Sequence, residues 1–586
     1  MRLKELGLKR IFGVAGNYAA PFLDTILEDK SDKRLQITGI SNELCAGYAA
    51  DGYARILGEK GLGAVAVTYG VGAFSLLNAV AGSYVEQVPI IVINGAPTNK
   101  QFTTQKSVGL LYSHMTPDTH SNIDVYRKVT AATARITNAS EAPLQIDSVL
   151  AACITYRQPV YIEVLEDVWR AQCQTPPERR PISREFLTKS KLNTEDAVNA
   201  TIELIQTYKK TDKAKPMFWA GAEIQRFGLQ QIFTDLLQIS GFEYTTSVIG
   251  KSVISEDHKL FSSVGLPRNA SCVIGLGSWT TSKDIGSKSI LGDRDKIFVS
   301  QGNAFVGGTF FANVPLGEYM ELLISKLEQR PQPKLFKDTY WSRPTYPDVS
   351  IPLSPLAEDK LDYERFFRIL NEGWIKGSSD TIVVVDASFP LIAAQRGLHI
   401  KAPNGFIAQA SWLSIGYAAP AAIGVKCAMD DNDVKNKRVI VIAGDGAFQE
   451  TCQAVSSYTY LRQNTVVFVL ANGIYGIEQK IVNPNPFRDQ PQSYSSREIY
   501  EYNKLCPWNY EKLTDVFGGG NGYVIDTPNQ LEEVISTLKE SENTDKNSII
   551  HVKIPEKSIP PTLIPSLEEP GEDEKDHPHW PPKDIF

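Results

Sequence analysis

Asp445 and Asn472 carry side-chain oxygens at the ends of two predicted strands in the second half of the chain. Residues 439–443 and 465–471 are short apolar runs rich in β-branched residues, which is typical of strands buried on both faces. The segment between them is long enough for a crossover helix, predicted over residues 449–463. Right-handed crossovers bring the ends of such parallel strands to one edge of the sheet. We therefore expect Asp445 and Asn472 to lie side by side.

These two residues offer the hard oxygen ligands that Mg²⁺ prefers. The carboxylate of Asp445, the amide oxygen of Asn472 and a backbone carbonyl near Ile474 would leave the other coordination positions to phosphate oxygens and water. Gly446 and the helix start after it offer unpaired amides to a phosphate. A Gly-Asp-Gly triplet is also an ordinary turn after a strand, so the residue types alone do not distinguish a metal site from a turn.

The spacing of these residues is more specific than their types. Residues 447–471, 25 in number, separate the Gly-Asp-Gly triplet from Asn472, and this pattern resembles the thiamine-diphosphate motif of the 2-oxo-acid decarboxylase superfamily. The usual Asn-Asn ending of that motif is Ala471-Asn472 here, which keeps the second, metal-binding Asn. The resemblance implies thiamine diphosphate and Mg²⁺ as cofactors, with Gly446 and Ala447 beside the diphosphate. Ala447 replaces a hydroxyl residue that is common in the family, so one potential phosphate contact is missing.

Glu43 lies in the sequence SNELCAGYAADGYAR, directly after a predicted strand. A purely structural interpretation is available, because Ser41 or Asn42 would cap the helix and a Glu in its first turn complements the helix dipole. However, this stretch and TYGVGAFSLLNAVAGSYVEQVP at 68–89 resemble the pyruvate and indolepyruvate decarboxylases over essentially the whole first domain. In that family the glutamate hydrogen-bonds the aminopyrimidine ring of the cofactor.

The resemblance gives Glu43 a catalytic role. A carboxyl group at that ring nitrogen favours the imino tautomer, whose nitrogen then deprotonates the neighbouring thiazolium carbon. Glu43 of one chain would meet Asp445 of another, which implies a homodimer or a homotetramer. The activity implied is non-oxidative decarboxylation of a 2-oxo acid (pyruvate, aromatic or branched-chain) to an aldehyde through an enamine.

Four further positions take roles from the same resemblance. Leu413 and Ile415 would offer backbone groups to the pyrimidine, with the Ile415 side chain bending the cofactor. Ser388, which follows a strand predicted at 381–385, is assigned to cofactor binding. Glu478, in IYGIEQ, matches the second glutamate of the family, beside the substrate carboxylate. A solvated glutamate at the start of a helix is the alternative interpretation of Glu478.

The chain departs from the family where protons are handled. The usual GxPGD sequence is Gly-Val-Ala-Gly-Asn17 here, and Asn17 cannot donate a proton as an acid. The usual His-His pair is reduced to His114, with His120 nearby after a slight insertion. Weaker proton delivery would slow aldehyde release, by about two to four powers of ten if protonation limits the rate.

Three hypotheses follow from these departures. The first is a decarboxylase in which water or His114 delivers the proton. The second is a carboligase that joins the enamine to a second carbonyl compound, giving an acyloin or an acetohydroxy acid. The third is a non-catalytic cofactor-binding subunit, which is disfavoured because Glu43, Asp445, Asn472 and Glu478 are all present.

Composition excludes several classes of protein. With 586 residues the chain is too long for one core and predicts three or four domains. A net charge of -7 argues against binding of nucleic acid or an anionic membrane surface. Seven scattered cysteines without metal spacing indicate reduced thiols, and we expect a cytoplasmic enzyme. No apolar run approaches the roughly 20 residues that span a bilayer, and the N-terminal sequence predicts an amphipathic start rather than a signal peptide.

The order of predicted elements indicates an α/β protein with three doubly wound parallel-sheet domains and an extended C-terminal tail. Strands alternate with helix-like segments in each domain, and proline-rich stretches at 171–184 and 331–357 predict linkers. The predicted parts are a pyrimidine-binding domain at 1–168, a middle domain at 190–330, a diphosphate-binding domain at 358–555 and a tail at 556–586.

Overall fold

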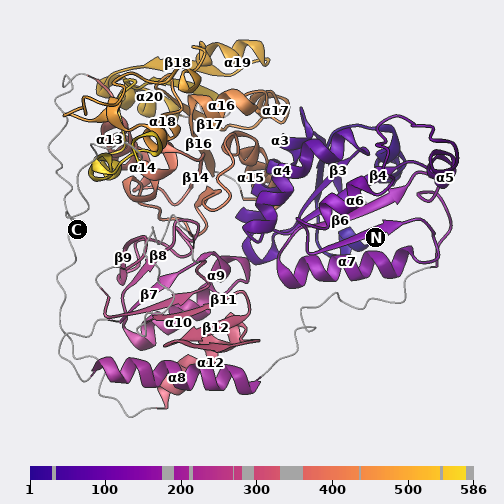
Figure 1. Ribbon diagram of the computed structural model, residues 1–586, viewed down its shortest axis with the longest axis horizontal. Helices are drawn as coiled ribbons and strands as arrows, with labels where there is room; N and C mark the ends of the chain where they lie inside the picture. The colour runs from indigo at the N-terminus through magenta and orange to yellow at the C-terminus, as the bar shows by residue number, and fades with distance from the viewer. Residues whose placement is uncertain are drawn as a thin grey trace. The chain divides into compact units, whose positions relative to one another are not determined.

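Three β-sheets, each built from a separate stretch of the chain, organise the fold (Figure 1). The structure is a computed structural model, and it describes residues 1–29, 34–174, 191–209, 216–267, 270–279, 281, 296–329, 360–434, 437–540 and 546–575. Most of the linker predicted at 171–184, and the whole of the one predicted at 331–357, lie outside these residues. The chain forms two compact units. The first comprises Met1–Pro344 and Ile423–Lys435, and the second comprises Thr345–Ala422 and Asn436–Phe586.

The first sheet is entirely parallel, in the order β2-β1-β3-β4-β6-β5. Its central strands are continuous apolar runs with every residue buried, because helices cover both faces. The strand β5, which sequence patterning did not predict, is a partly exposed edge strand with a weak apolar pattern. The elements are α1 (Arg2–Glu5), β1 (Arg10–Gly13), η1 (Asn17–Ala19), α2 (Ala20–Glu28), β2 (Gln36–Gly39), α3 (Glu43–Ile56), η2 (Gly58–Lys60), β3 (Gly63–Val67), α4 (Val71–Val85), β4 (Ile90–Ala96), α5 (Asn99–Val108), α6 (Ser121–Tyr126), β5 (Ala132–Ile136), α7 (Ala142–Tyr156) and β6 (Val160–Leu165).

The second sheet is mixed, in the order β13-β12-β11-β10-β7-β8-β9. Its five other strands run parallel, but β12 and β13 are antiparallel to their neighbours. Two tight turns reverse the chain, at Gln301-Gly302 and Gly307-Gly308, and all four residues have positive φ, as hairpin turns with the native strand twist require. The elements are α8 (Lys191–Lys209), β7 (Pro216–Ala220), α9 (Ala222–Arg226), α10 (Gln230–Ser240), β8 (Tyr244–Thr246), β9 (Phe261–Val264), β10 (Cys272–Leu276), β11 (Lys296–Ser300), β12 (Asn303–Val306), β13 (Thr309–Phe311) and α12 (Leu316–Glu328).

The third sheet is again all parallel, in the order β15-β14-β16-β17-β19-β18. The α/β class predicted from the sequence is therefore confirmed. The elements are α13 (Tyr363–Leu370), η4 (Asn371–Ile375), β14 (Thr381–Val385), α14 (Phe389–Gly397), β15 (Phe406–Ala408), α15 (Ala418–Asp431), β16 (Arg438–Gly444), α16 (Asp445–Thr451), α17 (Ala454–Tyr460), β17 (Val466–Ala471), α18 (Gly476–Val482), η5 (Asn485–Phe487), η6 (Glu501–Asn503), η7 (Tyr510–Lys512), α19 (Leu513–Val516), β18 (Asn521–Ile525), α20 (Pro528–Lys539), β19 (Ser548–Lys553), η9 (Pro561–Glu568) and η10 (Glu572–Glu574).

Two predictions for this part of the chain are corrected. The single crossover helix expected at 449–463 is two short helices, α16 and α17, and the first begins at Asp445 itself. The tail expected to be extended forms two 3₁₀ helices, η9 and η10, within its described residues. The reason is long-range packing, because these turns bury the Glu574 carboxylate and the Leu567 side chain against the unit.

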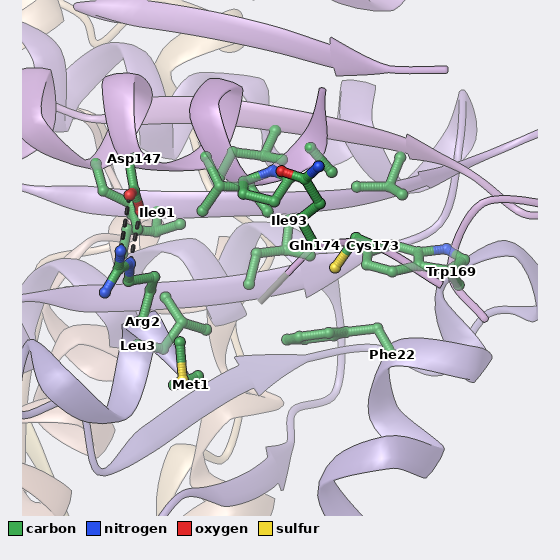
Figure 2. A pocket seen from close by; sticks show the side chains of 16 residues that line it. Met1, Arg2, Leu3, Phe22, Ile91, Ile93, Asp147, Trp169, Cys173 and Gln174 are labelled. Atoms are coloured by element: carbon green, nitrogen blue, oxygen red, sulfur yellow. Dashed lines mark hydrogen bonds and ion pairs between the residues drawn. The ribbon is translucent and has the colours of Figure 1, made fainter. Parts of the chain in front are cut away.

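A cavity of about 480 Å³ opens on one face of the first sheet (Figure 2). Its walls are apolar side chains of β4, β6, α2 and α7, with Trp169 at one end and the Arg2–Asp147 ion pair at the other. None of the residues predicted to do chemistry lines it. The cavity is therefore a feature of the apolar core rather than part of the candidate site.

Cysteine thiols are present in both units and, among the described residues, form no disulfide. Burial raises the pKa of Cys153 and of Cys272 to about 12, so these thiols stay protonated. Cys173 and Cys506 are exposed. No helix in the described ranges is long and apolar enough to cross a bilayer.

Candidate active site

Asp445 lies where the sequence predicted it, at the carboxyl edge of the third sheet. Strands β16 and β17 pair in parallel with Gly444 opposite Leu470, so the turns after them begin at the same edge. The Asp445 carboxylate accepts hydrogen bonds from the amides of Gly446 at 3.0 Å and Gly473 at 2.7 Å. Burial raises the pKa of Asp445 to about 6, although these amides favour the charged form.

A narrow pocket surrounds this carboxylate. The sequence analysis predicted nine cofactor-binding residues, and seven of them line this pocket: Ser388, Ile415, Asp445, Gly446, Ala447, Asn472 and Ile474. Tyr475 packs over Gly446 so closely that a Cβ at this position would lie 2.5 Å from its ring. A side chain at this position would therefore displace the Tyr475 ring.

The donor set in this pocket fits a magnesium diphosphate. No three His, Cys, Asp or Glu side chains cluster as metal ligands anywhere in the described sequence. The pocket instead combines one carboxylate, of Asp445, with the amide oxygen of Asn472 and the backbone at Ile474. A site with so few charged ligands suits an ion that keeps phosphate oxygens and water in its coordination shell, as Mg²⁺ does.

Asp386 is a site residue that the sequence analysis missed. It is fully buried at the end of β14, and its carboxylate accepts hydrogen bonds from the amides of Ala387 at 2.9 Å, Gly416 at 3.1 Å and Ala418 at 2.8 Å. The carbonyl of Gly416 in turn accepts from the Thr451 hydroxyl at 2.8 Å. These bonds fix the loop that places Ile415 in the pocket. Burial raises the pKa of Asp386 to about 7, against the effect of the three amides.

Two non-glycine residues near the pocket have strained backbones. Ser388, with φ 75°, lines the pocket and precedes α14. Leu413, with φ 59°, lies in the loop that Asp386 holds, but it does not line the pocket. Strained residues persist only where the surrounding structure determines them, and they concentrate at functional sites.

Glu43 begins α3 in the first unit, as predicted. Asn42 caps this helix by accepting a hydrogen bond from the Cys45 amide at 2.8 Å, which confirms the predicted cap. The Glu43 carboxylate lies against the start of α4, where a Cβ on Gly72 would be 3.3 Å from its Oε1 atom. The carboxylate is half-buried and thus open to a ligand.

Thr68 lies next to Gly72, as Glu43 does, and the sequence analysis did not identify it as a candidate. Its side chain occupies the space beneath Gly16, where a Cβ would collide with it, and its methyl group also faces Gly72. Its hydroxyl is buried and has no hydrogen-bond partner within the described ranges. Asn17, one residue beyond Gly16, is exposed at the start of η1.

The two histidines have different environments. His114 is exposed, has a φ of 67°, and stacks edge-on against Tyr18 with ring centroids 6.3 Å apart. Its backbone carbonyl packs against Gly70, two residues before Gly72, which contacts Glu43. His114 and Glu43 therefore both lie near the start of α4. His120 lies at the start of α6, with its Nδ1 atom 3.0 Å from the Thr119 hydroxyl. His120 is therefore the residue that precedes the first turn of α6.

Glu478 is exposed on α18, next to pocket-lining Ile477. Its neighbour Gln479 is buried and accepts hydrogen bonds from the Tyr500 amide at 2.8 Å and from Asn503 Nδ2 at 3.0 Å. The helix that carries Glu478 is thus anchored through Gln479, which leaves the glutamate free to face a substrate.

Comparison with known proteins agrees with this geometry. The N-terminal thiamine-pyrophosphate-binding domain of the thiamine pyrophosphate enzymes matches residues 1–117, and their C-terminal binding domain matches residues 388–552. A pyruvate decarboxylase of Aspergillus parasiticus is 29% identical over 542 residues, covering 88% of this chain and 86% of that protein. Pyruvate decarboxylase 2 of Oryza sativa subsp. japonica is 29% identical over 548 residues, covering 89% and 81%. Pyruvate decarboxylase 2 of Arabidopsis thaliana is 27% identical over 581 residues, covering 94% and 86%.

The two matched domains contain the two groups of site residues, Glu43 with its neighbours in the first and the Asp445 pocket in the second. The matched domains, together with relatives that cover most of the chain, support a thiamine-diphosphate-dependent 2-oxo-acid decarboxylase family for this protein.

Proposed function

We propose that this protein decarboxylates a 2-oxo acid non-oxidatively to an aldehyde, with thiamine diphosphate and Mg²⁺ as cofactors. The pocket at Asp445 carries the proposal, because the Asp445 carboxylate, the Asn472 amide oxygen and the backbone at Ile474 fit a magnesium ion that also binds a diphosphate. The similarity to proteins named pyruvate decarboxylase supports the reaction type. Pyruvate and the aromatic and branched-chain 2-oxo acids are the proposed substrates.

The pocket residues would hold the cofactor. Asp445, Asn472 and the Ile474 carbonyl are the proposed metal ligands, and the Gly446 amide would face a phosphate. Bound thiamine diphosphate supplies a carbon nucleophile and accepts the electron pair released when the carboxylate leaves. Ile415 would press against the bound cofactor, because Asp386 fixes its loop.

Glu43 would hold a proton at a ring nitrogen of the aminopyrimidine. Its half-buried carboxylate has space beside it only because position 72 is glycine. Glu478 would face the substrate carboxylate. His114, which like Glu43 lies near the start of α4, is the titratable group proposed to pass a proton to the product, directly or through water, since Asn17 has no acidic proton to give.

A second copy of the chain is the proposed partner, as a homodimer or homotetramer. The outward face of α4, which begins beside Glu43, exposes apolar side chains, Val71 at 55% and Phe74 at 37%. Neighbouring exposed apolar residues of this size are typical of an interface with another protein. This arrangement supports an assembly in which Glu43 of one copy serves the cofactor held at Asp445 of another.

A carboligase is the second candidate, and the exposed position of Asn17 favours it. An amide there cannot supply the proton that ends the decarboxylase cycle. The carbon nucleophile left after loss of CO₂ would then persist long enough to add to a second carbonyl compound. The product would be an acyloin or an acetohydroxy acid.

Product analysis distinguishes these functions. The purified protein is incubated with thiamine diphosphate, Mg²⁺ and a panel of 2-oxo acids, alone and in pairs, and CO₂, aldehydes and ligated products are quantified. Equal amounts of free aldehyde and CO₂ would support the decarboxylase. Ligated products in excess would support the carboligase, and no CO₂ from any acid, with cofactor bound, would contradict both.

A further inference from the structure

A buried ion pair fastens the C-terminal part of the chain to the third sheet's unit. Arg488 and Glu574 form a two-pronged pair, with Arg488 Nη1 2.9 Å from one carboxylate oxygen and Nη2 3.1 Å from the other. Their side chains are 1% and 2% exposed. Arg488 also donates to the carbonyls of Leu567 at 2.7 Å and Glu569 at 3.3 Å. All four of these acceptor atoms lie in the segment 556–575.

Packing reinforces this attachment at two further points. Leu567 is 5% exposed and packs in a cluster with Ile474, Phe487 and Ile499. Gly571 lies against the carbonyl of Val482, the last residue of α18, where a Cβ would collide with it. The segment thus touches the end of α18 and, through Leu567, the residue that follows Gly473 in the pocket.

Polar contacts extend from the segment to the middle of α18. The pKa of Tyr500 is raised by burial and by the neighbouring carboxylate of Asp573, so the segment lies beside this tyrosine. The Tyr500 amide donates a hydrogen bond to the Gln479 side chain. Gln479 is fully buried and adjacent to Glu478. A continuous set of contacts therefore joins Glu574 and Asp573 to the helix that carries Glu478.

The metal-binding loop is held by other groups. The Asp445 carboxylate binds the Gly473 amide, the Leu505 amide donates to the Gly473 carbonyl at 2.9 Å, and the Tyr475 amide donates to the Asn503 carbonyl at 2.8 Å. None of these bonds involves the segment 556–575. The segment reaches this loop through the apolar contact of Leu567 with Ile474. Loss of the Arg488–Glu574 pair should therefore displace α18 and leave in place the hydrogen bonds that hold the Asp445 side of the pocket.

We propose that the Arg488–Glu574 pair is a positioning device for the 2-oxo acid: it holds α18 so that Glu478 meets the substrate carboxylate. This inference rests on the proposed function. Neither residue is a catalytic residue, because both act through α18. A buried ion pair contributes little net stability compared with apolar packing, but breaking it leaves an unpaired buried charge that forces local rearrangement. The pair is thus suited to fixing geometry.

The test compares Glu574→Gln and Arg488→Lys with Glu372→Gln as control. The control removes the charge of an exposed carboxylate paired with Lys376 at 3.1 Å, far along the chain from α18. The glutamine introduced by the first variant would keep one acceptor for Arg488, and the lysine introduced by the second would lack the second prong. Three quantities are measured for each full-length protein: amide hydrogen exchange of residues 476–482, cofactor affinity by fluorescence titration, and KM and kcat for the 2-oxo acid.

We expect exchange in 476–482 to quicken by about tenfold in both variants, as local opening becomes easier. The ratio kcat/KM should fall by about tenfold to a hundredfold, mainly through KM, because a small displacement of a positioning group is this costly. Cofactor affinity should match that of the wild type and of the control. If either variant fails to fold, the other carries the test.

Two results would overturn the proposal. One is unchanged exchange in 476–482. The other is a cofactor affinity that falls in parallel with kcat/KM, which would mean general loosening of the pocket. A wild-type protein that turns over no 2-oxo acid would refute the proposed function instead. In that case the exchange measurement still decides whether the pair holds α18.

Discussion

The substitution Asp386→Asn tests whether the Asp386 carboxylate holds the loop beside the pocket at Asp445. In the wild type one carboxylate oxygen accepts from the amides of Ala387 and Gly416, and the other accepts from Ala418. The amide oxygen of asparagine can replace the first, but its NH₂ group would face the Ala418 amide, a second donor. One buried N–H then loses its acceptor, which costs about 1–3 kcal/mol. The loop carrying Ile415 should relax to relieve this cost.

In the variant, the loop must return to its wild-type conformation before the cofactor can bind. The free energy of this rearrangement therefore lowers the affinity for thiamine diphosphate. A penalty of about 1–3 kcal/mol corresponds to a Kd for thiamine diphosphate with Mg²⁺ raised by about fivefold to a hundredfold. Fluorescence titration of the wild type and the variant measures this ratio. Thr527→Ala is the control, because it removes the acceptor of the Gln530 amide at the start of α20, away from the pocket. Equal affinities in Asp386→Asn and Thr527→Ala would refute the reasoning.

The effect of the same substitution on the free energy of unfolding should depend on pH in a known direction. Burial raises the pKa of Asp386 from 3.8 to about 7 in the folded protein, so between these values the folded state keeps a proton that the unfolded state has released. This group therefore favours folding at low pH, and its contribution is lost as the pH rises towards 7, about 4 kcal/mol in all. The asparagine of the variant has no such proton. The stability difference between wild type and variant, from urea unfolding at pH 5 and pH 8, should favour the wild type more at pH 5; an equal difference at both would contradict the burial argument.

Three further predictions concern the chemistry. Glu43→Gln should abolish turnover while leaving the fold and cofactor affinity intact, as measured by CO₂ release, circular dichroism and titration; appreciable residual activity would contradict its role. Affinity for Mg²⁺ should fall as the pH drops through about 6, because burial raises the pKa of Asp445 to about 6 and a proton then competes with the metal; a flat profile in Mg²⁺-titrated fluorescence would argue against Asp445 as a ligand. Asn17→Asp restores an acid and should raise the ratio of free aldehyde to ligated product, measured by chromatography; an unchanged ratio would show that protons come from elsewhere.

The sequence predicted the parts of the site that depend on sheet topology. Parallel strands in register determine where their carboxyl ends meet, so the proximity of Asp445 and Asn472 followed from two apolar runs and their spacing. The cap at Asn42 followed from local helix chemistry in the same way. Such features need only short-range patterns and general rules of strand connection.

The remainder depends on contacts that a local pattern does not contain. Asp386 acquires its role only because a loop some 30 residues later returns to it, and nothing near it in the sequence indicates this. The ion pair of Arg488 and Glu574 spans 86 positions and converts a predicted extended tail into ordered turns. By contrast, Gly307-Gly308 is a recognisable hairpin signal, and the antiparallel edge of the second sheet could have been predicted from it.

The distribution of thiols gives the protein a natural optical reporter. Four cysteines are buried, and burial raises the pKa of two of them, Cys153 and Cys272, to about 12. A thiol-reactive dye should therefore label the native protein at the exposed Cys173 and Cys506. With Cys173→Ser, the dye would be attached at Cys506. Its backbone is hydrogen-bonded to Gln449, on the helix that starts at Asp445. Emission from such a conjugate would respond to a ligand that binds in the pocket at Asp445, and the measurement needs no substrate.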